Sequence, residues 1–314
     1  MTATLYFIAG LVLLTLAGDA LVRGAVAIAV RLHVPTIIIG LTIVSMGTSA
    51  PELFVALQAA LGGAPFLAVG NAIGSNIANS LIVLGLPALI APIYLLEPGT
   101  RRSVIFMFAV SLAVFALATD GAISSFDGML LLLLFAIYLA YGYVLAQTAR
   151  RDARQQFLKD NPPPSLPLLK PVIMLVFGFV GLALGARLTV DGALLLAEAL
   201  GIGQTVVGTT IVALGTTLPE ISATLAAAFR RQAGVAVGNI IGSNIFNILG
   251  ILGITALVAP LPVDPRLLSF DLWVMLGAAA TLLPMAFLRR PIGRWVGSLL
   301  SLSYLAYLFL AFAG

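Results

Sequence analysis

The chain is dominated by long apolar runs separated by short polar segments. A run of about 20 apolar residues is long enough to cross the roughly 30 Å hydrocarbon core of a bilayer as an α-helix. We therefore expect an all-α polytopic membrane protein, because a membrane β-barrel would show short segments of alternating polarity instead. The pattern predicts ten transmembrane helices, over residues 4–30, 36–61, 66–90, 102–119, 126–147, 171–197, 204–229, 234–258, 268–288 and 293–312.

One polar stretch, residues 148–170, has the composition of a linker, with several basic residues and three consecutive prolines. It divides the chain into an N-terminal half, residues 1–147 with spans one to five, and a C-terminal half, residues 171–314 with spans six to ten.

A shift of 168 residues aligns the two halves. Residues 40–52 match residues 208–220 at eight of 13 positions, and residues 68–79 match residues 236–247 at ten of 12. Because each half has an odd number of spans, the second half is expected to insert upside down, giving two inverted-topology five-helix repeats. Many secondary transporters have this architecture, with the substrate site near the midplane between the repeats. A duplicated structural bundle is the alternative, but it would not need polar residues at the repeated positions.

Two glutamates, Glu52 and Glu220, occupy equivalent positions deep inside apolar spans. An ionised carboxylate at the bilayer centre costs at least about 2.5 kcal/mol, so such a residue indicates a functional site. The alternative is a carboxylate at a helix end that reaches the interface. Each glutamate follows a proline, Pro51 or Pro219, which removes one backbone N–H and clashes with the carbonyl four residues earlier, so a break or kink is predicted.

Hydroxyl and amide side chains repeat around both glutamates. Helical spacing places Thr48 and Ser49 on one face with Glu52, and the same pattern recurs in the second half. Oxygen donors of this kind suit Ca²⁺ or Na⁺ rather than a soft metal. The candidate side-chain ligands are Thr48, Ser49, Glu52, Ser75 and Asn79 in the first half, and Thr216, Thr217, Glu220, Ser243 and Asn247 in the second. Hydrogen bonding between helices is predicted instead for Asn71, Asn76, Asn239 and Asn244.

The basic residues predict how the chain is oriented. With the N-terminus outside, 13 of the 16 Lys and Arg residues fall on the inner side. The positive-inside rule therefore favours outer N- and C-termini and a cytoplasmic linker in the cell membrane. The pI near 9.7 is then explained by the basic residues that orient the chain in the membrane, and no nucleic-acid partner is expected. The chain has no cysteine, which excludes disulfides and thiolate metal sites.

Four further charged residues fall inside predicted spans. Asp19 and Arg23, and likewise Arg187 and Asp191, are spaced four residues apart, and the 168-residue shift superposes them with the signs exchanged. We expect neutralising pairs between the first and sixth spans, or alternatively a gate that exchanges partners during transport. The single histidine, His33, is expected to be solvated in an inner loop and not to bind metal.

The two Gly-Thr-Ser/Thr-x-Pro-Glu segments and the two Gly-Asn-x-x-Gly-Ser-Asn-x-x-Asn segments resemble the paired repeats of the calcium:cation antiporter family, in its sodium/calcium exchanger branch. The resemblance covers nearly the whole chain. It implies a cation site lined by the second, third, seventh and eighth spans, with the ten side-chain ligands above and backbone carbonyl ligands near Ser45 and Ala213. It also implies alternating access, with the first and sixth spans sliding across the rest. Asn247 stands where some relatives have Asp, an acid tied to potassium, so potassium dependence is not expected.

Two carboxylates balance one Ca²⁺ or two Na⁺, and neutral oxygens are available for a third Na⁺. The expected function is therefore exchange of several Na⁺ for one Ca²⁺. A Ca²⁺/H⁺ antiporter using the same site is the alternative. A channel would need a continuous pore, and an intramembrane hydrolase would need a catalytic pair that the sequence lacks. The protein is expected to act as a monomer in the lipid bilayer, to carry inorganic cations, to need no cofactor and not to be an enzyme.

Overall fold

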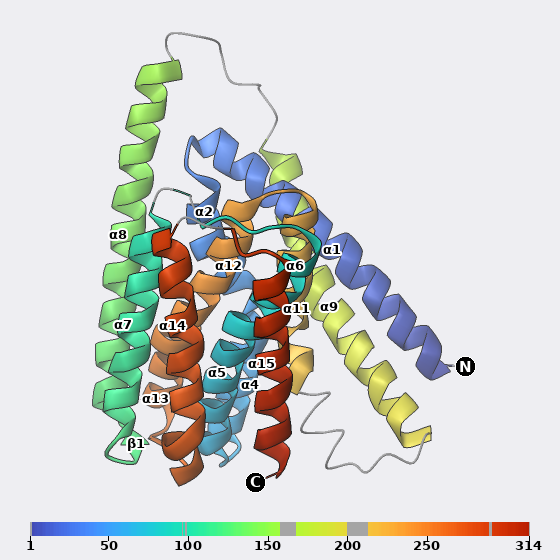
Figure 1. The fold of residues 1–314 in the computed structure, drawn as a ribbon, viewed down its shortest axis with the longest axis vertical. Helices are drawn as coiled ribbons and strands as arrows, with labels where there is room; N and C mark the ends of the chain where they lie inside the picture. The colour runs from blue at the N-terminus through green and yellow to red at the C-terminus, as the bar shows by residue number, and fades with distance from the viewer. Residues whose placement is uncertain are drawn as a thin grey trace.

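The structure is a computed structural model that describes residues 2–95, 97, 99–157, 168–199, 213–288 and 291–313. Apart from one short two-stranded ribbon, the regular structure in these residues is helical (Figure 1). The first half contains α1 (Thr2–Leu32), α2 (Thr36–Ile39), η1 (Gly40–Val44), α3 (Ser45–Thr48), α4 (Ala50–Leu61), α5 (Pro65–Ala78), η2 (Asn79–Val83), α6 (Leu84–Ile90), α7 (Thr100–Ala118), β1 (Ala122–Ile123) and α8 (Ser125–Phe157). The second half contains α9 (Leu169–Ala199), α11 (Ala213–Phe229), α12 (Ala233–Ile245), η4 (Phe246–Leu252), α13 (Gly253–Val258), β2 (Leu261–Pro262), η5 (Leu267–Asp271), α14 (Leu272–Leu288) and α15 (Arg294–Ala313).

Eight helical segments in the described residues are long and apolar enough to cross a membrane. The bent run α2 to α4 raises that number to nine. The remaining predicted span, residues 204–229, is represented by the 17 residues of α11, since residues 204–212 lie outside the described part of the chain. The chain is thus a multi-span helical membrane protein, and the number ten stays a prediction.

The predicted distortion before Glu52 is confirmed. The helix axis bends by 43° between Thr36–Thr48 and Ala50–Leu61. The bend falls at Ser49, two residues before Pro51, as expected when proline disrupts the preceding turn. In the second half Pro219 lies inside α11, which runs without interruption from Ala213. Of the residues that correspond to Thr36–Thr48, residues 213–216 belong to α11 and residues 204–212 lie outside the described part of the chain.

The π-helical segments were not predicted from the sequence. Two of them begin at Asn79 in η2 and at Phe246 in η4, and the second contains Asn247. A π-bulge widens the helical turn and occurs frequently at functional sites. The same distortion therefore accompanies the candidate asparagine ligand in each half.

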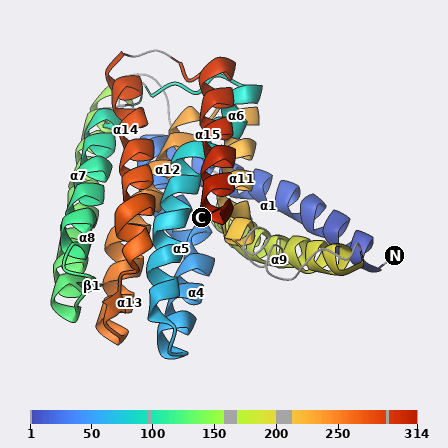
Figure 2. The same cartoon turned by 60° about the horizontal axis from the view of Figure 1, so that its bottom comes forward.

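The segments that carry the candidate ligands form the centre of the molecule. The continuous rods α5–η2–α6 and α12–η4–α13 are mostly buried, whereas few residues of α8, on the outside of the bundle, are buried. The helices α1 and α9 pack along each other and together lean away from the bundle, on the side opposite α7 and α8 (Figure 2). Close packing of α1 on α9 depends on small residues. A Cβ on Gly178 would lie 2.7 Å from the Leu21 side chain, and one on Gly181 would lie 2.7 Å from Ala17.

The expected ion pairs between the first and sixth spans are wrong. Arg23 pairs with Asp19 on the same helix at 2.9 Å, and Arg187 pairs with Asp191 on α9 at 3.8 Å. Asp19 also forms an ion pair with Arg230, just after α11. The α1–α9 interface is packed with apolar residues such as Leu21 and Leu182, and a spacing of four lets each charged pair meet on one helix face.

Backbone bridges join the two halves at both ends of α7. Beyond its C-terminal end, β1 pairs with β2 through Ile123 and Leu261. Before its N-terminal end, Ile93 pairs with Ile292. The 168-residue shift aligns Ile93 with Leu261. It also aligns Ser124 with Ile292, and Ser124 is the residue next to Ile123. Each bridge is therefore the repeat-related counterpart of the other, to within one residue.

We expect Gly238→Ala to destabilise the protein, because a Cβ at Gly238 would lie 2.6 Å from the Ile37 carbonyl oxygen and 2.8 Å from the Gly40 Cα. Overpacking against backbone costs about 1–3 kcal/mol. The control is Gly277→Ala in α14, where no described atom lies within 4 Å of the added carbon. Thermal unfolding in detergent measures both variants. Equal melting temperatures would show that the contact between α12 and the α2–η1 segment is not tight.

Candidate cation-binding site

Glu52 and Glu220 lie in the interior of the bundle, each with only 1% of its surface exposed. Glu52 sits in the first turn of α4, directly after the bend, and Glu220 sits one residue after Pro219 in α11. This burial excludes the alternative of helix-end carboxylates that reach the interface. No Lys or Arg side chain forms an ion pair with either carboxylate within the described residues.

One hydrogen bond connects the two halves at this point. Ser49 Oγ donates to Glu220 Oε1 at 2.7 Å. Ser49 is the residue at the bend, with φ −87° and ψ 10°, and the bend turns its side chain toward α11. The hydroxyl predicted to ligate beside Glu52 thus contacts the carboxylate of the other repeat.

Five buried oxygen atoms of the predicted ligands have no hydrogen-bond partner among the described residues. They are Glu52 Oε2, Asn79 Oδ1, Glu220 Oε2, Ser243 Oγ and Asn247 Oδ1. Buried polar atoms are almost always paired, and an exception calls for an ion, an ordered water or a catalytic role. The other unpaired buried atoms belong to Thr100, Tyr138, Asn244 and Ser301.

The donor set fits a hard cation. The unpaired atoms are carboxylate, amide and hydroxyl oxygens, the ligands that Ca²⁺ takes. Among the described residues no three His, Cys, Asp or Glu side chains come together. Two carboxylates completed by neutral oxygens are therefore the available cage.

The asparagines predicted to join helices do so. Asn76 Nδ2 donates to the Asn244 carbonyl at 3.3 Å, and Asn244 Nδ2 donates to Ser80 Oγ at 2.9 Å. Asn239 Nδ2 donates to Thr224 Oγ1 at 3.1 Å. For Asn71 the contact is long, 3.5 Å from Nδ2 to the Glu52 carbonyl.

One of these amides also orients a candidate ligand. Asn247 Nδ2 donates to Asn76 Oδ1 at 3.0 Å. Because the amide nitrogen is fixed in this bond, the unpaired Oδ1 of Asn247 is the atom left for a cation.

Other predicted ligands are engaged within the protein. Thr48 Oγ1 lies 3.0 Å from Asn239 Oδ1 and 3.2 Å from the Ser45 carbonyl, which also accepts the Ser49 N–H at 3.0 Å. The single Thr48 hydroxyl proton can serve only one of these two acceptors at a time, so the Ser49 N–H is the donor that the Ser45 carbonyl always has in this conformation. Ala213, the second predicted carbonyl ligand, is the first residue of α11.

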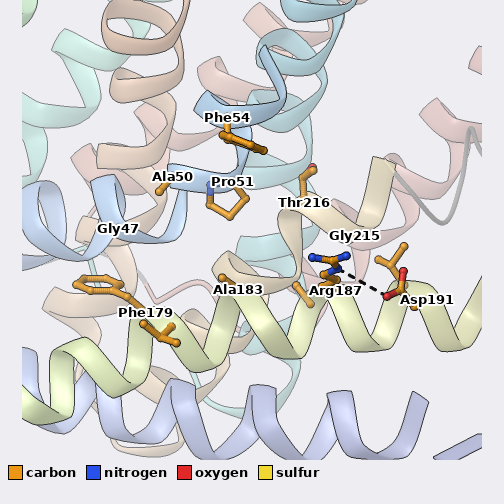
Figure 3. A pocket seen from close by; sticks show the side chains of 13 residues that line it. Gly47, Ala50, Pro51, Phe54, Phe179, Ala183, Arg187, Asp191, Gly215 and Thr216 are labelled. Atoms are coloured by element: carbon orange, nitrogen blue, oxygen red, sulfur yellow. Dashed lines mark ion pairs between the residues drawn. The ribbon is translucent and has the colours of Figure 1, made fainter. Parts of the chain in front are cut away.

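Two cavities are lined in part by candidate ligands. A cavity of about 630 Å³ separates α9 from the bend before α4 and the start of α11, and Figure 3 shows Pro51 and Thr216 on one wall and the Arg187–Asp191 pair on another. A second cavity, of about 280 Å³, is lined by Ser75 and Thr217 together with Tyr304 of α15. Thr216 thus borders the first cavity, and Ser75 and Thr217 border the second.

Sequence reasoning missed one buried acid. Asp271 is 7% exposed, at the end of η5, and accepts a hydrogen bond from Tyr307 at 2.8 Å. The only signal was an acidic residue near the start of a predicted span. Its carboxylate has a partner, unlike Oε2 of the two central glutamates.

Comparison with known proteins assigns the chain to a family. The sequence model of the sodium/calcium exchanger protein family matches residues 2–144 and 170–313. The chain belongs to the sodium/calcium exchanger family. Exchangers of this family are cation antiporters that transport Na⁺ and Ca²⁺.

Individual relatives extend over almost the full length of this exchanger-family chain. It is 37% identical to the putative antiporter CaxA of Alkalimonas amylolytica, over 100% of this chain and 99% of the relative. It is 32% identical to the sodium/calcium exchanger MaX1 of Methanosarcina acetivorans, over 98% of both chains. A solved structure of the sodium-calcium exchanger NCX_Mj soaked with Na⁺ and Sr²⁺ superposes with a TM-score of 0.84 at 34% identity, covering 100% of this chain and 98% of that one.

We expect Ser49→Ala to weaken cation binding, because Glu220 loses the hydroxyl that orients it. A hydrogen bond to a charged group contributes about 1.5–3 kcal/mol, which corresponds to a loss of affinity of about tenfold or more. The shift in melting temperature during Ca²⁺ and Na⁺ titrations measures the affinity. The control is Ser111→Ala, which removes a buried hydroxyl on α7 that bonds the Met107 carbonyl. Unchanged affinity in Ser49→Ala would contradict this role.

Proposed function

We propose that this protein exchanges Na⁺ for Ca²⁺ by alternating access at a site built around Glu52 and Glu220. The supporting observation is the pair of buried carboxylates, one from each half, each with an oxygen that has no partner in the described residues. A carboxylate buried without a cationic side chain is costly, and a bound cation removes that cost.

The proposed ligand set follows the sequence repeat. It comprises Thr48, Ser49, Glu52, Ser75 and Asn79, their counterparts Thr216, Thr217, Glu220, Ser243 and Asn247, and the carbonyls of Ser45 and Ala213. Because the same oxygens serve both ions, Na⁺ and Ca²⁺ compete instead of binding together, and this competition couples their fluxes.

The charge balance leads to an electrogenic cycle. Two carboxylates are neutralised by one Ca²⁺ or by two Na⁺. A third Na⁺ bound by hydroxyl and carbonyl oxygens leaves a net positive charge on the sodium-loaded protein. Transport with that stoichiometry responds to membrane potential.

We further propose ten transmembrane helices in two inverted five-helix repeats, residues 1–147 and 171–314, with residues 148–170 as a cytoplasmic linker and both termini outside the cell membrane. Three observations support the repeat. Asn76 contacts Asn244, its own counterpart, the π-bulges recur, and the two backbone bridges exchange under the 168-residue shift. The protein is proposed to act as a monomer, without enzymatic activity.

Alternating access is proposed to occur by sliding of α1 and α9. These helices pack mainly on each other and lean away from the bundle (Figure 2). The large cavity separates α9 from the bend before α4, so α9 has space on the side that faces the site. The ion pair from Asp19 to Arg230 ties α1 to the end of α11 in this conformation.

Uptake of radioactive Ca²⁺ into proteoliposomes tests the exchange. Vesicles loaded with Na⁺ and diluted into Na⁺-free buffer are expected to accumulate Ca²⁺, whereas K⁺-loaded vesicles are not. Glu52→Gln and Glu220→Gln should abolish uptake, because each removes one of the two charges that bind the divalent ion. Asp271→Asn is the matched control, since it neutralises a buried carboxylate that lies outside the site.

Two outcomes of the same assay would contradict the proposal. Uptake driven by a pH gradient alone, and independent of internal Na⁺, would establish the alternative Ca²⁺/H⁺ antiporter at the same glutamates. Uptake retained in Glu220→Gln would remove that residue from the site.

Acid is expected to inhibit transport, because protons and cations compete for the two carboxylates. Initial Ca²⁺ uptake rates at saturating Na⁺ gradient should fall between about pH 8 and about pH 5.5, and added Ca²⁺ should restore them. An uptake rate that stays constant across this pH range would contradict this, because it would mean that protons do not compete with cations for the two carboxylates.

A further inference from the structure

A third cavity, of about 300 Å³, lies between α7 and α8, away from the candidate cation site. Neither helix contributes a predicted ligand. The cavity begins beside Gly99, at the N-terminal end of α7, and continues along α8 past Tyr141 and Tyr138. In Figure 1 these helices form the edge of the bundle farthest from α1 and α9.

The end of this cavity next to Gly99 is polar and positively charged. Arg102 lines it, and its Nη1 donates to the Tyr141 hydroxyl at 3.1 Å. A guanidinium has five N–H donors, and it binds phosphate in a fork geometry. Since Arg102 is exposed and the described residues show one of its donors engaged, the others are available to an anion.

The deeper part of the cavity is apolar and contains one unsatisfied polar atom. Phe106 and Ile137 line it together with Tyr138, whose ring stacks on Phe106 at 5.2 Å. The Tyr138 hydroxyl is buried and has no hydrogen-bond partner in the described residues. A buried hydroxyl without a partner costs free energy, so an acceptor or donor supplied by a ligand at this depth would be favourable.

The position of the cavity restricts the kind of ligand. Few residues along the apolar span of α8 are buried, and Leu133, Ile137 and Val144 are each more than half exposed, so this face of α8 meets lipid in a membrane protein. A tyrosine and an arginine at the end of a span lie at the level of the lipid headgroups. Basic pockets between transmembrane helices bind anionic lipid headgroups. A volume near 300 Å³ is at the lower limit for ligand pockets, enough for the headgroup and the start of one chain.

We propose that the α7–α8 cavity binds an anionic phospholipid. Arg102 and Tyr141 hold the headgroup phosphate, the Tyr138 hydroxyl hydrogen-bonds to an ester oxygen at the glycerol level, and the first part of one acyl chain lies against Phe106 and Ile137. This binding requires the membrane location of α7 and α8 but not the ion specificity of the transporter.

Native mass spectrometry of the full-length, delipidated protein tests this site. The probes are phosphatidylglycerol, phosphatidylcholine of the same chain length and inorganic phosphate. Wild type is expected to retain one phosphatidylglycerol, and Arg102→Gln should weaken that binding about tenfold, the loss expected when a charge-assisted phosphate contact is removed. Tyr138→Phe should weaken it less, because a neutral hydrogen bond is lost.

Arg101→Gln is the matched control. It makes the same change of charge at the neighbouring residue, but the Arg101 guanidinium lies 4.0 Å from the centre of the Phe287 ring on α14. Thermal unfolding without lipid verifies that all variants are folded. The proposal would be overturned if Arg101→Gln and Arg102→Gln lost phosphatidylglycerol binding equally. It would also be overturned if wild type retained phosphatidylcholine as well as phosphatidylglycerol, or if inorganic phosphate bound as strongly as the lipid and in the same Arg102-dependent way.

Discussion

The structure depends on the burial of two carboxylates, Glu52 and Glu220, in a membrane interior, where no basic side chain of the described residues pairs with them. Such burial is unfavourable unless a cation or proton is supplied. The hydrogen bond from Ser49 satisfies one oxygen of Glu220, and one oxygen of each glutamate stays without a partner in the described part of the chain. A stable fold with this centre therefore requires a cation or a proton at the carboxylates.

The rest of the molecule positions these groups. The bend at Ser49 and the π-bulges beginning near Asn79 and Asn247 turn polar side chains inward from helices that are otherwise apolar. Glycines such as Gly238 let α12 approach the backbone of the α2–η1 segment closely. An amide contact between Asn76 and Asn244 then joins the two halves of the chain.

Hydropathy and repetition along the chain were sufficient to predict the helical membrane fold, the bend before Glu52 and the structural asparagines. Apolar runs, proline and repeated motifs have local consequences, so these features can be inferred without knowing how the helices pack. The π-bulges, the Tyr307–Asp271 contact and the partner of Asp19 were not predicted. They depend on which helix faces come together, and here Arg230 reaches Asp19 whereas the α1–α9 interface is apolar. The cavities were missed for the same reason.

Anomalous scattering from crystals soaked with Sr²⁺, a heavier analogue of Ca²⁺, tests the central claim most directly. The account predicts one strong peak between the Glu52 and Glu220 carboxylates, within coordination distance of Asn79 or Asn247 oxygens, that weakens as Na⁺ is added. A peak elsewhere in the bundle, or one between the glutamates that is indifferent to Na⁺, would contradict a single shared site for competing cations.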